Sequence, residues 1–379
     1  MGSAVRVGTR AGAARTTRLF LAGDVMLGRG VDQALGRSVE PWLFEHFVRD
    51  ARDYLVLAER ANGPVGGPLA PEAPWGALCE PLARWVPDAR VVNLETALTS
   101  HAVPWAGKGI HYRAHPGNVD VLTSFGVDVA GLANNHVLDW GRPGLDETLV
   151  TLHGAGVAVA GAGCDARQAA VPAAIETPAG RLLVFAACFA DAGVPEDWGA
   201  DGDVSGVWLL PDPSPRGAEA LAGHVLAHRR PGDLVIVSLH WGPNWGYGVP
   251  AWQREFAQRL LGAEAADLVL GHSSHHPKGI EVFDGRAILY GAGDLINDYE
   301  GIEGHERYRP DLTLGYLASL AADGRLVSLL MLPLRRRRLR LERATPEEGR
   351  WLAASLSRAG AGFGTRVDVT NDGGLALRW

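Results

Sequence analysis

Five short apolar runs, each followed at once by polar residues, constrain the fold of this chain more than any other feature of its sequence. The runs are Arg18–Ala22, Ala89–Val92, Val127–Ala133, Asp233–Leu239 and Ala266–Leu270. Apolar runs of this length are typical of β-strands that are buried on both faces. We therefore expect a buried core of strands whose ends carry polar side chains.

Helical patterns alternate with these runs, and the alternation indicates an α/β fold. The predicted helices are Leu145–Gly154, Gly217–Arg229 and Ala251–Leu261. Two pairs of short strands, each joined by a glycine-containing turn, interrupt the alternation. These hairpins are Ala173–Glu176 with Leu182–Ala187, and Ile280–Phe283 with Ala287–Tyr290. The pattern therefore favours a mixed core of two sheets with helices outside them over a simple doubly wound sheet.

The chain is expected to divide into a body with smaller segments around it. We predict a flexible N-terminus over residues 1–17, a body over 18–334 with an insertion or lid at 30–88, and a C-terminal strand and helix extension over 335–379. In the extension, Thr345, Pro346 and Glu348 form the sequence pattern of a capping box, which predicts the start of a helix. The preceding arginine run, Arg335–Arg338 and then Arg340, is expected to lie on a strand with a charged face, because leucines stand on both sides of it. The alternative is a site for phosphates or membrane headgroups.

Composition and charge exclude several classes of protein. The chain has 379 residues, with 43 Asp and Glu against 36 Lys and Arg, and this weak acidity is not typical of proteins that coat nucleic acid. No apolar run approaches the roughly 18 residues of a membrane helix, and residues 1–18 lack the apolar core of a signal peptide. Three scattered cysteines form neither a disulfide framework nor a thiolate metal site. We therefore expect a cytoplasmic protein without a membrane anchor or a nucleic-acid partner.

The polar residues that follow the strands have the side chains of a divalent metal site. They are Asp24, Glu95, Asn135, His136, His240, His272 and His275. Ligands in α/β sheets gather at the carboxyl ends of strands, and this mixture of oxygen and nitrogen donors suits zinc, manganese, iron, cobalt or nickel. Each residue alone has an ordinary structural explanation, but five such strand ends in one chain are not expected by chance. The sequence therefore predicts one or two divalent metal ions, and no nucleotide or organic cofactor.

Taken in order along the chain, the motifs Gly-Asp, Asn-Leu-Glu, Asn-Asn-His, His-Trp and Gly-His-x-x-His closely resemble those of the CapA family. The matching segments are Ala22–Gln33, Val92–Thr96, Lys108–Ala114, Leu132–Gly144, Leu234–Trp241 and Ala266–Tyr299. This family is the poly-γ-glutamate capsule-synthesis branch of the calcineurin-like metallophosphoesterase fold. The resemblance implies a four-layer α/β/β/α sandwich with a metal site at one rim of the paired sheets.

The resemblance also implies a role for each matching residue. Four residues match metal ligands of the family: Asp24, Asn135, His240 and His272. Glu95 stands where the wider superfamily has a bridging carboxylate. His136 matches an acid–base histidine, and His275 matches the last histidine of the CapA pattern. His276 competes with His275 for that last role, because the spacing alone does not separate the two neighbours.

Two departures from the general phosphoesterase signature affect the predicted metal site. That signature opens with Asp-x-His and closes with Gly-His-x-His, whereas this chain has Met26 and Ser274 at the two second-histidine positions. Both changes remove or move a ligand of one of two metal ions, so we expect one ion or an asymmetric pair. Asp294 and Asp298 are candidates to replace the lost ligand, with turn capping as the alternative for Asp294.

Four further residues are expected to bind the substrate. Lys108 and Arg113 lie in a family-like stretch, and their charges suit a carboxylate or phosphate. Trp241 and Trp245 follow His240 in an aromatic loop and suit the wall of a pocket for a bulky or peptide-like substrate. The alternatives are surface charge for the two cations and packing under a long loop for the two tryptophans.

Three functions are compatible with such a site. The leading expectation is metal-assisted proton transfer at a peptide α-carbon, because CapA-like proteins encoded with lasso-peptide precursors resemble this chain and are peptide epimerases. His136 would serve one face of that carbon and His275 or His276 the other. The alternatives are metal-dependent hydrolysis of a phosphoester or amide, and an accessory role in poly-γ-glutamate synthesis. In each case the expected partner is a peptide or γ-glutamyl-type substrate.

Overall fold

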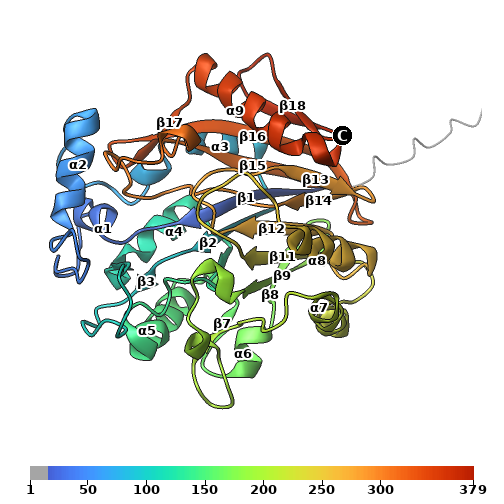
Figure 1. The fold of residues 1–379 in the computed structure, drawn as a ribbon, viewed down its shortest axis with the longest axis horizontal. Helices are drawn as coiled ribbons and strands as arrows, with labels where there is room; N and C mark the ends of the chain where they lie inside the picture. Colours follow the sequence, from blue (N-terminus) through green and yellow to red (C-terminus); the bar gives the residue numbers. More distant parts are fainter. Residues whose placement is uncertain (1–15) are drawn as a thin grey trace, which may run out of the picture.

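Two β-sheets pack against each other at the centre of the molecule (Figure 1). They are seen in a computed structural model, which describes residues 16–379. The predicted flexible N-terminus therefore lies outside the described residues except for its last two positions. The second of these, Thr17, already begins the first strand.

The first sheet has nine strands and mixes parallel with antiparallel pairing. Its order is β18 (Arg366–Val369), β19 (Leu375–Arg378), β16 (Leu326–Arg337), β15 (Leu312–Leu320), β1 (Thr17–Val25), β2 (Ala89–Leu94), β5 (Val129–Gly131) and β6 (Ala158–Ala160), with β17 (Arg340–Arg343) paired to β16. Strand β1 runs parallel to β2 and antiparallel to β15. The predicted C-terminal extension is thus continuous with this sheet, because β17, β18 and β19 all belong to it.

The second sheet has six strands. Its order is β13 (Ile280–Phe283), β14 (Arg286–Leu289), β12 (Leu268–His272), β11 (Leu234–His240), β9 (Gly180–Cys188) and β8 (Ala173–Thr177). Strand β11 is parallel to both neighbours, whereas β8–β9 and β13–β14 are the two expected antiparallel hairpins. Two small ribbons, β3 (Ala97–Leu98) with β4 (Arg113–Ala114) and β7 (Ala162–Gly163) with β10 (Gly206–Val207), complete the strands. These sheets confirm the predicted mixed α/β fold.

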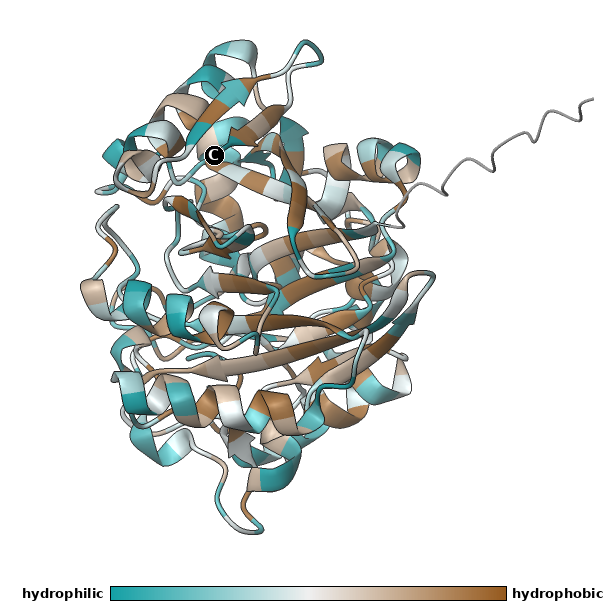
Figure 2. Cartoon of the chain, turned by 90° about the vertical axis from the view of Figure 1, so that its right-hand side faces the viewer, coloured by the Kyte–Doolittle hydropathy of each residue, from teal (hydrophilic) through white to brown (hydrophobic). Residues whose placement is uncertain are grey.

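Alternation along the strands of the second sheet divides its apolar residues between two cores. In β11, Ile236 belongs to the main core shared with the first sheet, whereas Val237 packs beneath α7 (Pro215–His228) and α8 (Ala251–Gly262). Figure 2 shows apolar residues gathered along the strands in the interior. Because both faces are covered, the strands are apolar throughout, which explains the continuous runs in the sequence.

Further helices add apolar side chains to the main core. They are α3 (Cys79–Trp85), α4 (Asp120–Phe125), α5 (Gly141–Gly154) and α9 (Pro346–Gly360), and the short α6 (Ala166–Ala170) lies against β7. At the start of α9, the Thr345 hydroxyl accepts a hydrogen bond from the Glu348 amide, and the Glu348 carboxylate accepts one from the Thr345 amide. The capping box is therefore confirmed. Within residues 16–379, no helix has the length and apolar character needed to cross a membrane.

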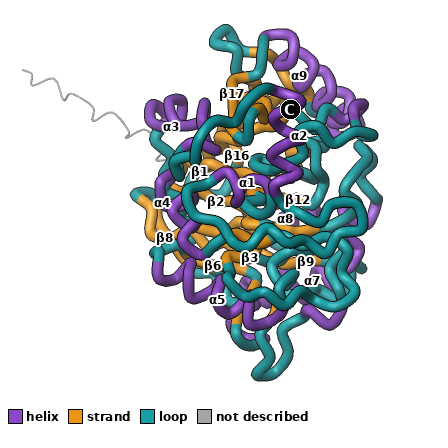
Figure 3. The backbone as a smooth tube through the Cα atoms, turned by 90° about the vertical axis from the view of Figure 1, so that its left-hand side faces the viewer, coloured by secondary structure: helices purple, strands orange, loops and turns teal. Residues whose placement is uncertain are grey.

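The segment 30–88, expected to be an insertion or lid, has two parts. Helices α1 (Gly30–Ala34) and α2 (Arg52–Asn62) lie on one flank of the molecule with long loops around them (Figure 3). The remainder is packed into the main core, where the Trp75 ring stacks on Phe125 with their centroids 3.9 Å apart. This second part has weak sequence periodicity because it forms short 3₁₀ and α-helical turns rather than one long amphipathic helix.

Candidate metal centre

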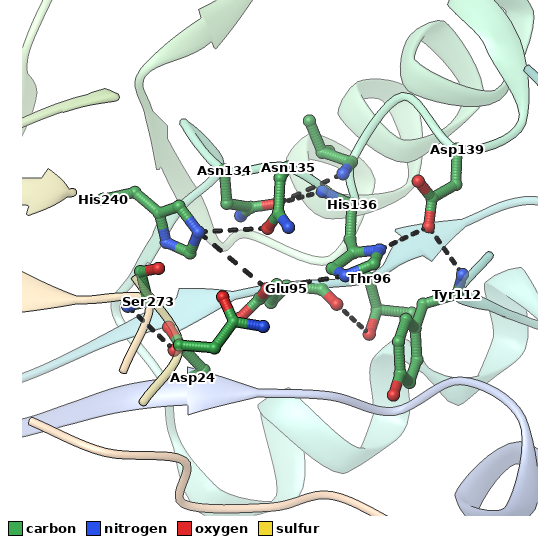
Figure 4. A network of polar contacts seen from close by, with 12 residues as sticks. Asp24, Glu95, Thr96, Tyr112, Asn134, Asn135, His136, Asp139, His240 and Ser273 are labelled. Atoms are coloured by element: carbon green, nitrogen blue, oxygen red, sulfur yellow. Dashed lines mark hydrogen bonds and ion pairs between the residues drawn. The ribbon is translucent and has the colours of Figure 1, made fainter. Parts of the chain in front are cut away.

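The carboxyl ends of four strands bring acidic and imidazole groups together (Figure 4). Asp24 lies near the end of β1 and Glu95 directly after β2, while His240 and His272 are the last residues of β11 and β12. All four side chains are buried. We call these four residues the candidate metal centre, and it draws on both sheets.

Close backbone approaches determine where Asp24 and His272 lie. A Cβ atom at Gly23 would stand 2.2 Å from the carbonyl oxygen of Gly293, so only glycine fits before Asp24. The β1–β2 register shifts between Leu21 and Asp24, and such a bulge re-aims the side chains that follow it. After His272, Ser273 has a φ of +92°, and its amide donates to Asp24 Oδ2 at 3.1 Å. The strained residue thus contributes directly to the site.

Three residues of the centre place donor atoms close enough together to hold a metal ion. One donor atom from each of Asp24, His240 and His272 lies within 4.8 Å of the others. The Nδ1 atoms of the two histidines are 2.8 Å apart, and His272 Nδ1 is 3.6 Å from Asp24 Oδ1. Burial lowers the pKa of His272 to about 3, which keeps its imidazole neutral and able to bind a metal. Its Nε2 is 2.8 Å from the Ser238 hydroxyl, an outer contact that orients the ring.

The carboxylates of Asp24 and Glu95 are buried among other acidic groups. Glu95 Oε2 is buried without a hydrogen-bond partner. Burial, and then the charge of Asp294, raises the pKa of Asp24 to about 7, while burial and then Asp24 raise the pKa of Glu95 well above its usual value. Asp24 Oδ1 accepts one hydrogen bond, from Asn93 at 2.7 Å. Buried carboxylates next to neutral imidazoles are a donor set that fits a divalent metal ion.

Asn135 and His136 lie on the Nε2 side of His240. The side-chain oxygen of Asn135 is 3.0 Å from that nitrogen, and Glu95 Oε1 is 3.9 Å from it. His136 Nε2 is 3.8 Å from the same Glu95 oxygen. His240 therefore presents one ring nitrogen to the Asp24–His272 cluster and the other to Asn135 and Glu95.

His136 is held by two residues, one of which the sequence analysis missed. Its Nδ1 is 2.6 Å from Asp139 Oδ2, and the other Asp139 oxygen is 2.7 Å from Lys108 Nζ. Lys108 Nζ is also 3.2 Å from His136 Nδ1. The buried Asp139 keeps the proton on Nδ1, which leaves Nε2 directed toward Glu95. The signal for Asp139 was its position three residues after His136, where one helical turn returns to the same side.

The structure separates His275 from His276. Nδ1 of His275 is 3.0 Å from both oxygens of Asp294, whose carboxylate also accepts from Asn297 at 2.8 Å. Burial opposes protonation of His275, but Asp294 outweighs it and raises the pKa of this imidazole. Both ring nitrogens of His276 contact the backbone: Nδ1 is 3.1 Å from Pro277 O, and Nε2 accepts a hydrogen bond from the Gly246 amide at 3.1 Å. Asp294 thus lies beside the centre as the partner of His275.

Asp298, the other candidate replacement ligand, is engaged elsewhere. Its carboxylate accepts from the Arg29 guanidinium, with Nε at 3.1 Å, and from the Gly30 amide at 2.9 Å. The Arg29 guanidinium lies between two aromatic rings, 3.8 Å from the Tyr54 centroid and 4.2 Å from that of Tyr112. This buried cluster anchors α1 and α2 beside the centre.

The four predicted substrate-binding residues divide into two pairs. Lys108 and Trp245 lie at the site. The Lys108 Nζ is 3.2 Å from His136 Nδ1, and the Trp245 ring centroid is 5.2 Å from that of His275. Arg113 is turned inward, where it donates to His101 O at 2.7 Å and lies over the Trp140 ring. Trp241 is also buried, and its Nε1 donates to Tyr290 O at 3.1 Å. Arg113 and Trp241 therefore support the loops rather than face a substrate.

Comparisons with known proteins cover most of the chain. The family model of the bacterial capsule synthesis protein PGA_cap matches residues 18–299. A probable polyglutamine synthesis accessory protein of Mycobacterium tuberculosis is 45% identical over 357 residues, which cover 93% of this chain and 94% of that protein. The PGA biosynthesis protein CapA of Bacillus subtilis is 27% identical over 220 residues, covering 58% and 54% of the two chains. The capsule biosynthesis protein CapA of Bacillus anthracis is 24% identical over 284 residues, covering 74% and 59%.

Proposed function

This chain belongs to the PGA_cap family of bacterial capsule synthesis proteins, which includes the CapA proteins, and on that premise we propose that it is a metal-dependent accessory enzyme of glutamate-polymer synthesis. Its reaction is the hydrolysis of an amide or phosphoester bond in the polymer or in an intermediate of its assembly. The names of its relatives support the setting, and the candidate metal centre supports the chemistry.

The observation that carries this proposal is the buried cluster of Asp24, His240 and His272 beside the unpartnered Glu95 Oε2. These four residues would hold the metal ion, with Asn135 next to them. The ion would supply Lewis-acid chemistry, which polarises a carbonyl or phosphoryl oxygen and acidifies water. We also propose that the two facing sheets and their outer helices form the four-layer α/β/β/α sandwich of the calcineurin-like metallophosphoesterases.

In this proposal His136 moves the proton. Burial lowers the pKa of His136 to about 4, so the imidazole is neutral at physiological pH and its free Nε2 accepts a proton. Asp139 stabilises the imidazolium that forms, through its hydrogen bond to Nδ1. Lys108, whose Nζ is 2.7 Å from Asp139 Oδ1, balances the charge of the pair and would attract an anionic substrate group.

Domain limits follow from the same proposal. Residues 18–334 form the catalytic body, and residues 335–379 extend its first sheet and add α9. Within 30–88, the loop between α1 and α2 is the part suited to act as a lid, because it is largely exposed, whereas both helices and the remainder contribute side chains to the main core.

Peptide epimerisation ranks second. It needs an acid–base group on each face of a carbon atom, and the molecule has two histidine–aspartate pairs, His136 with Asp139 and His275 with Asp294. The named relatives do not support it, since their names refer to polymer synthesis.

A single experiment separates these reactions. Metal-loaded protein is incubated in heavy water with γ-linked glutamate oligomers and with a peptide encoded beside the gene, and the products are analysed by mass spectrometry. Cleavage with uptake of water, lost in His136→Asn and retained in His153→Asn, an exposed residue near the end of α5, is the expected result. One non-exchangeable deuterium without cleavage would establish epimerisation instead. No change in any substrate would contradict both reactions.

A further inference from the structure

The arginine run at the end of β16 lines a cavity beside the metal centre, and we propose that this cavity binds a free carboxylate of the glutamate polymer. This inference rests on the proposed function for the identity of the polymer. It assigns a ligand to Arg337, a residue outside the reaction chemistry.

The cavity has a volume of about 560 Å³, and the segment with Asn297 and Tyr299 links its lining to the surroundings of the metal centre. Asn297 and Tyr299 line it, and both contact the centre's neighbours: Asn297 donates to Asp294, and the Tyr299 ring centroid is 5.1 Å from that of His275. A polymer that extends from the metal centre past Tyr299 would therefore bring its next repeats to this cavity.

The acidic residues of the cavity already have partners. Asp311 forms an ion pair with Arg309, and Glu348 forms ion pairs with Arg309 and Arg335. Glu300 accepts hydrogen bonds from the backbone amides of Arg338 and Leu339. Glu306 accepts one from the backbone amide of Gly304. Arg336 is likewise satisfied, because it donates to backbone carbonyl oxygens. Each carboxylate that lines the cavity therefore has a hydrogen-bond or ion-pair partner within the protein.

Arg337 differs from the arginines around it. It lines the same cavity, its Nε is buried without a hydrogen-bond partner, and none of the described residues forms an ion pair with it. Arg337 acts electrostatically on Glu342, but the two oxygens of this carboxylate are held by Arg335 at 3.1 Å and Arg338 at 2.9 Å. The half-buried Arg337 thus lines the cavity without an ion-pair partner, and a guanidinium group binds oxyanions through charge-assisted hydrogen bonds.

The ligand that fits is a carboxylate on an extended chain. A γ-linked glutamate polymer has one free carboxylate on each repeat, and a guanidinium group binds a carboxylate in two parallel hydrogen bonds. Phosphate shares this chemistry, so the test includes it as a separate ligand. The cavity is large enough for a chain segment rather than a single ion.

Binding of a γ-linked glutamate pentamer to the full-length protein tests the proposal by calorimetry. We expect Arg337→Gln to weaken binding roughly tenfold or more, since a charge-assisted hydrogen bond is lost. Arg337→Lys should restore part of the loss, and Arg350→Gln, an exposed arginine of α9 that does not line the cavity, should bind as the wild type does. Thermal melts of each variant confirm folding before binding is compared.

Three outcomes would overturn the proposal: equal binding by wild type and Arg337→Gln, no binding of the pentamer by the wild type, or binding of inorganic phosphate that excludes the pentamer. Failure of the proposed hydrolysis is a separate result. Pentamer binding that depends on Arg337, without any cleavage of the pentamer, would support this site and contradict the reaction.

Discussion

His136 shows how one residue depends on another that lacks a conspicuous sequence signal. Asp139 is fully buried and accepts hydrogen bonds from both His136 and the Tyr112 amide. Asp139→Asn would keep the shape of the contact but lose the charge that stabilises the imidazolium. We expect roughly a hundredfold loss of metal-dependent turnover, with metal binding unchanged. Turnover near the wild-type level, measured on metal-loaded protein, would contradict the assigned role.

Lys278 provides a prediction about pH at the same scale. It is 1% exposed, and burial lowers its pKa from 10.5 to about 8. The folded protein therefore binds fewer protons than the unfolded chain between these values, so the free energy of unfolding rises with pH over this window. At pH 7 the charged form costs about 3 kcal/mol.

Lys278→Met should remove both effects: the free energy of unfolding increases by up to about 3 kcal/mol at pH 7, and its rise above pH 8 disappears. Urea unfolding from pH 7 to pH 10 measures both. The exposed Arg378→Met serves as the control and should keep the wild-type profile. A rise that persists in Lys278→Met would rule out Lys278 as its source.

Sequence reasoning reached most of the candidate metal centre, because each residue follows a buried strand. Asp24, Glu95, His240 and His272 were all predicted from strand ends, and the structure brings them together. Sequence reasoning could not distinguish His275 from His276, because the motif spacing fits either of two adjacent histidines. What separates them is a three-dimensional contact, with Asp294 for the first and with the backbone for the second.

At the scale of elements, strands and long helices agree closely with the expectations. The helix predicted over Ala251–Leu261 ends one residue later, and the strand predicted to end at Leu239 ends at His240. The segment 30–88 was harder, because its short turns have no extended periodicity. Its place in the fold is set by tertiary contacts, such as the Trp75–Phe125 stack, which no local pattern records.

The capping box of α9 gives an element-scale prediction. Thr345→Ala removes the hydroxyl that accepts from the Glu348 amide and should lower the free energy of unfolding by about 1 kcal/mol. Thr123→Ala, an exposed position in α4, should change it much less. Denaturant unfolding compares the two variants. Equal effects would show that the capping contact adds nothing beyond the general cost of the substitution.

The whole molecule is joined by the candidate metal centre, because Asp24 belongs to the first sheet and His240 and His272 to the second. A metal ion that binds the folded protein alone should raise its free energy of unfolding, by about 2.7 kcal/mol at a hundredfold excess over its dissociation constant. Thermal melts with and without a chelator measure this gain.

Asp24→Asn is the matched variant for that measurement. Both Asp24 oxygens accept hydrogen bonds, from Asn93 and from the Ser273 amide, and an amide can keep only one of them, so the metal-free variant should be about 1 kcal/mol less stable. It should also lose the metal-dependent gain, which the exposed Asp368→Asn retains. A full gain in Asp24→Asn would exclude this residue as a ligand.

The pairing of β11 with β12 has a consequence for how correctly folded molecules can be counted. His240 and His272 are direct partners in that parallel ladder. A slip of one residue would turn one imidazole to the opposite face of the sheet, and the cluster with Asp24 would no longer form. Metal stoichiometry thus becomes an assay of register: the fraction of a refolded preparation that takes up metal reports the fraction whose two central strands have aligned correctly.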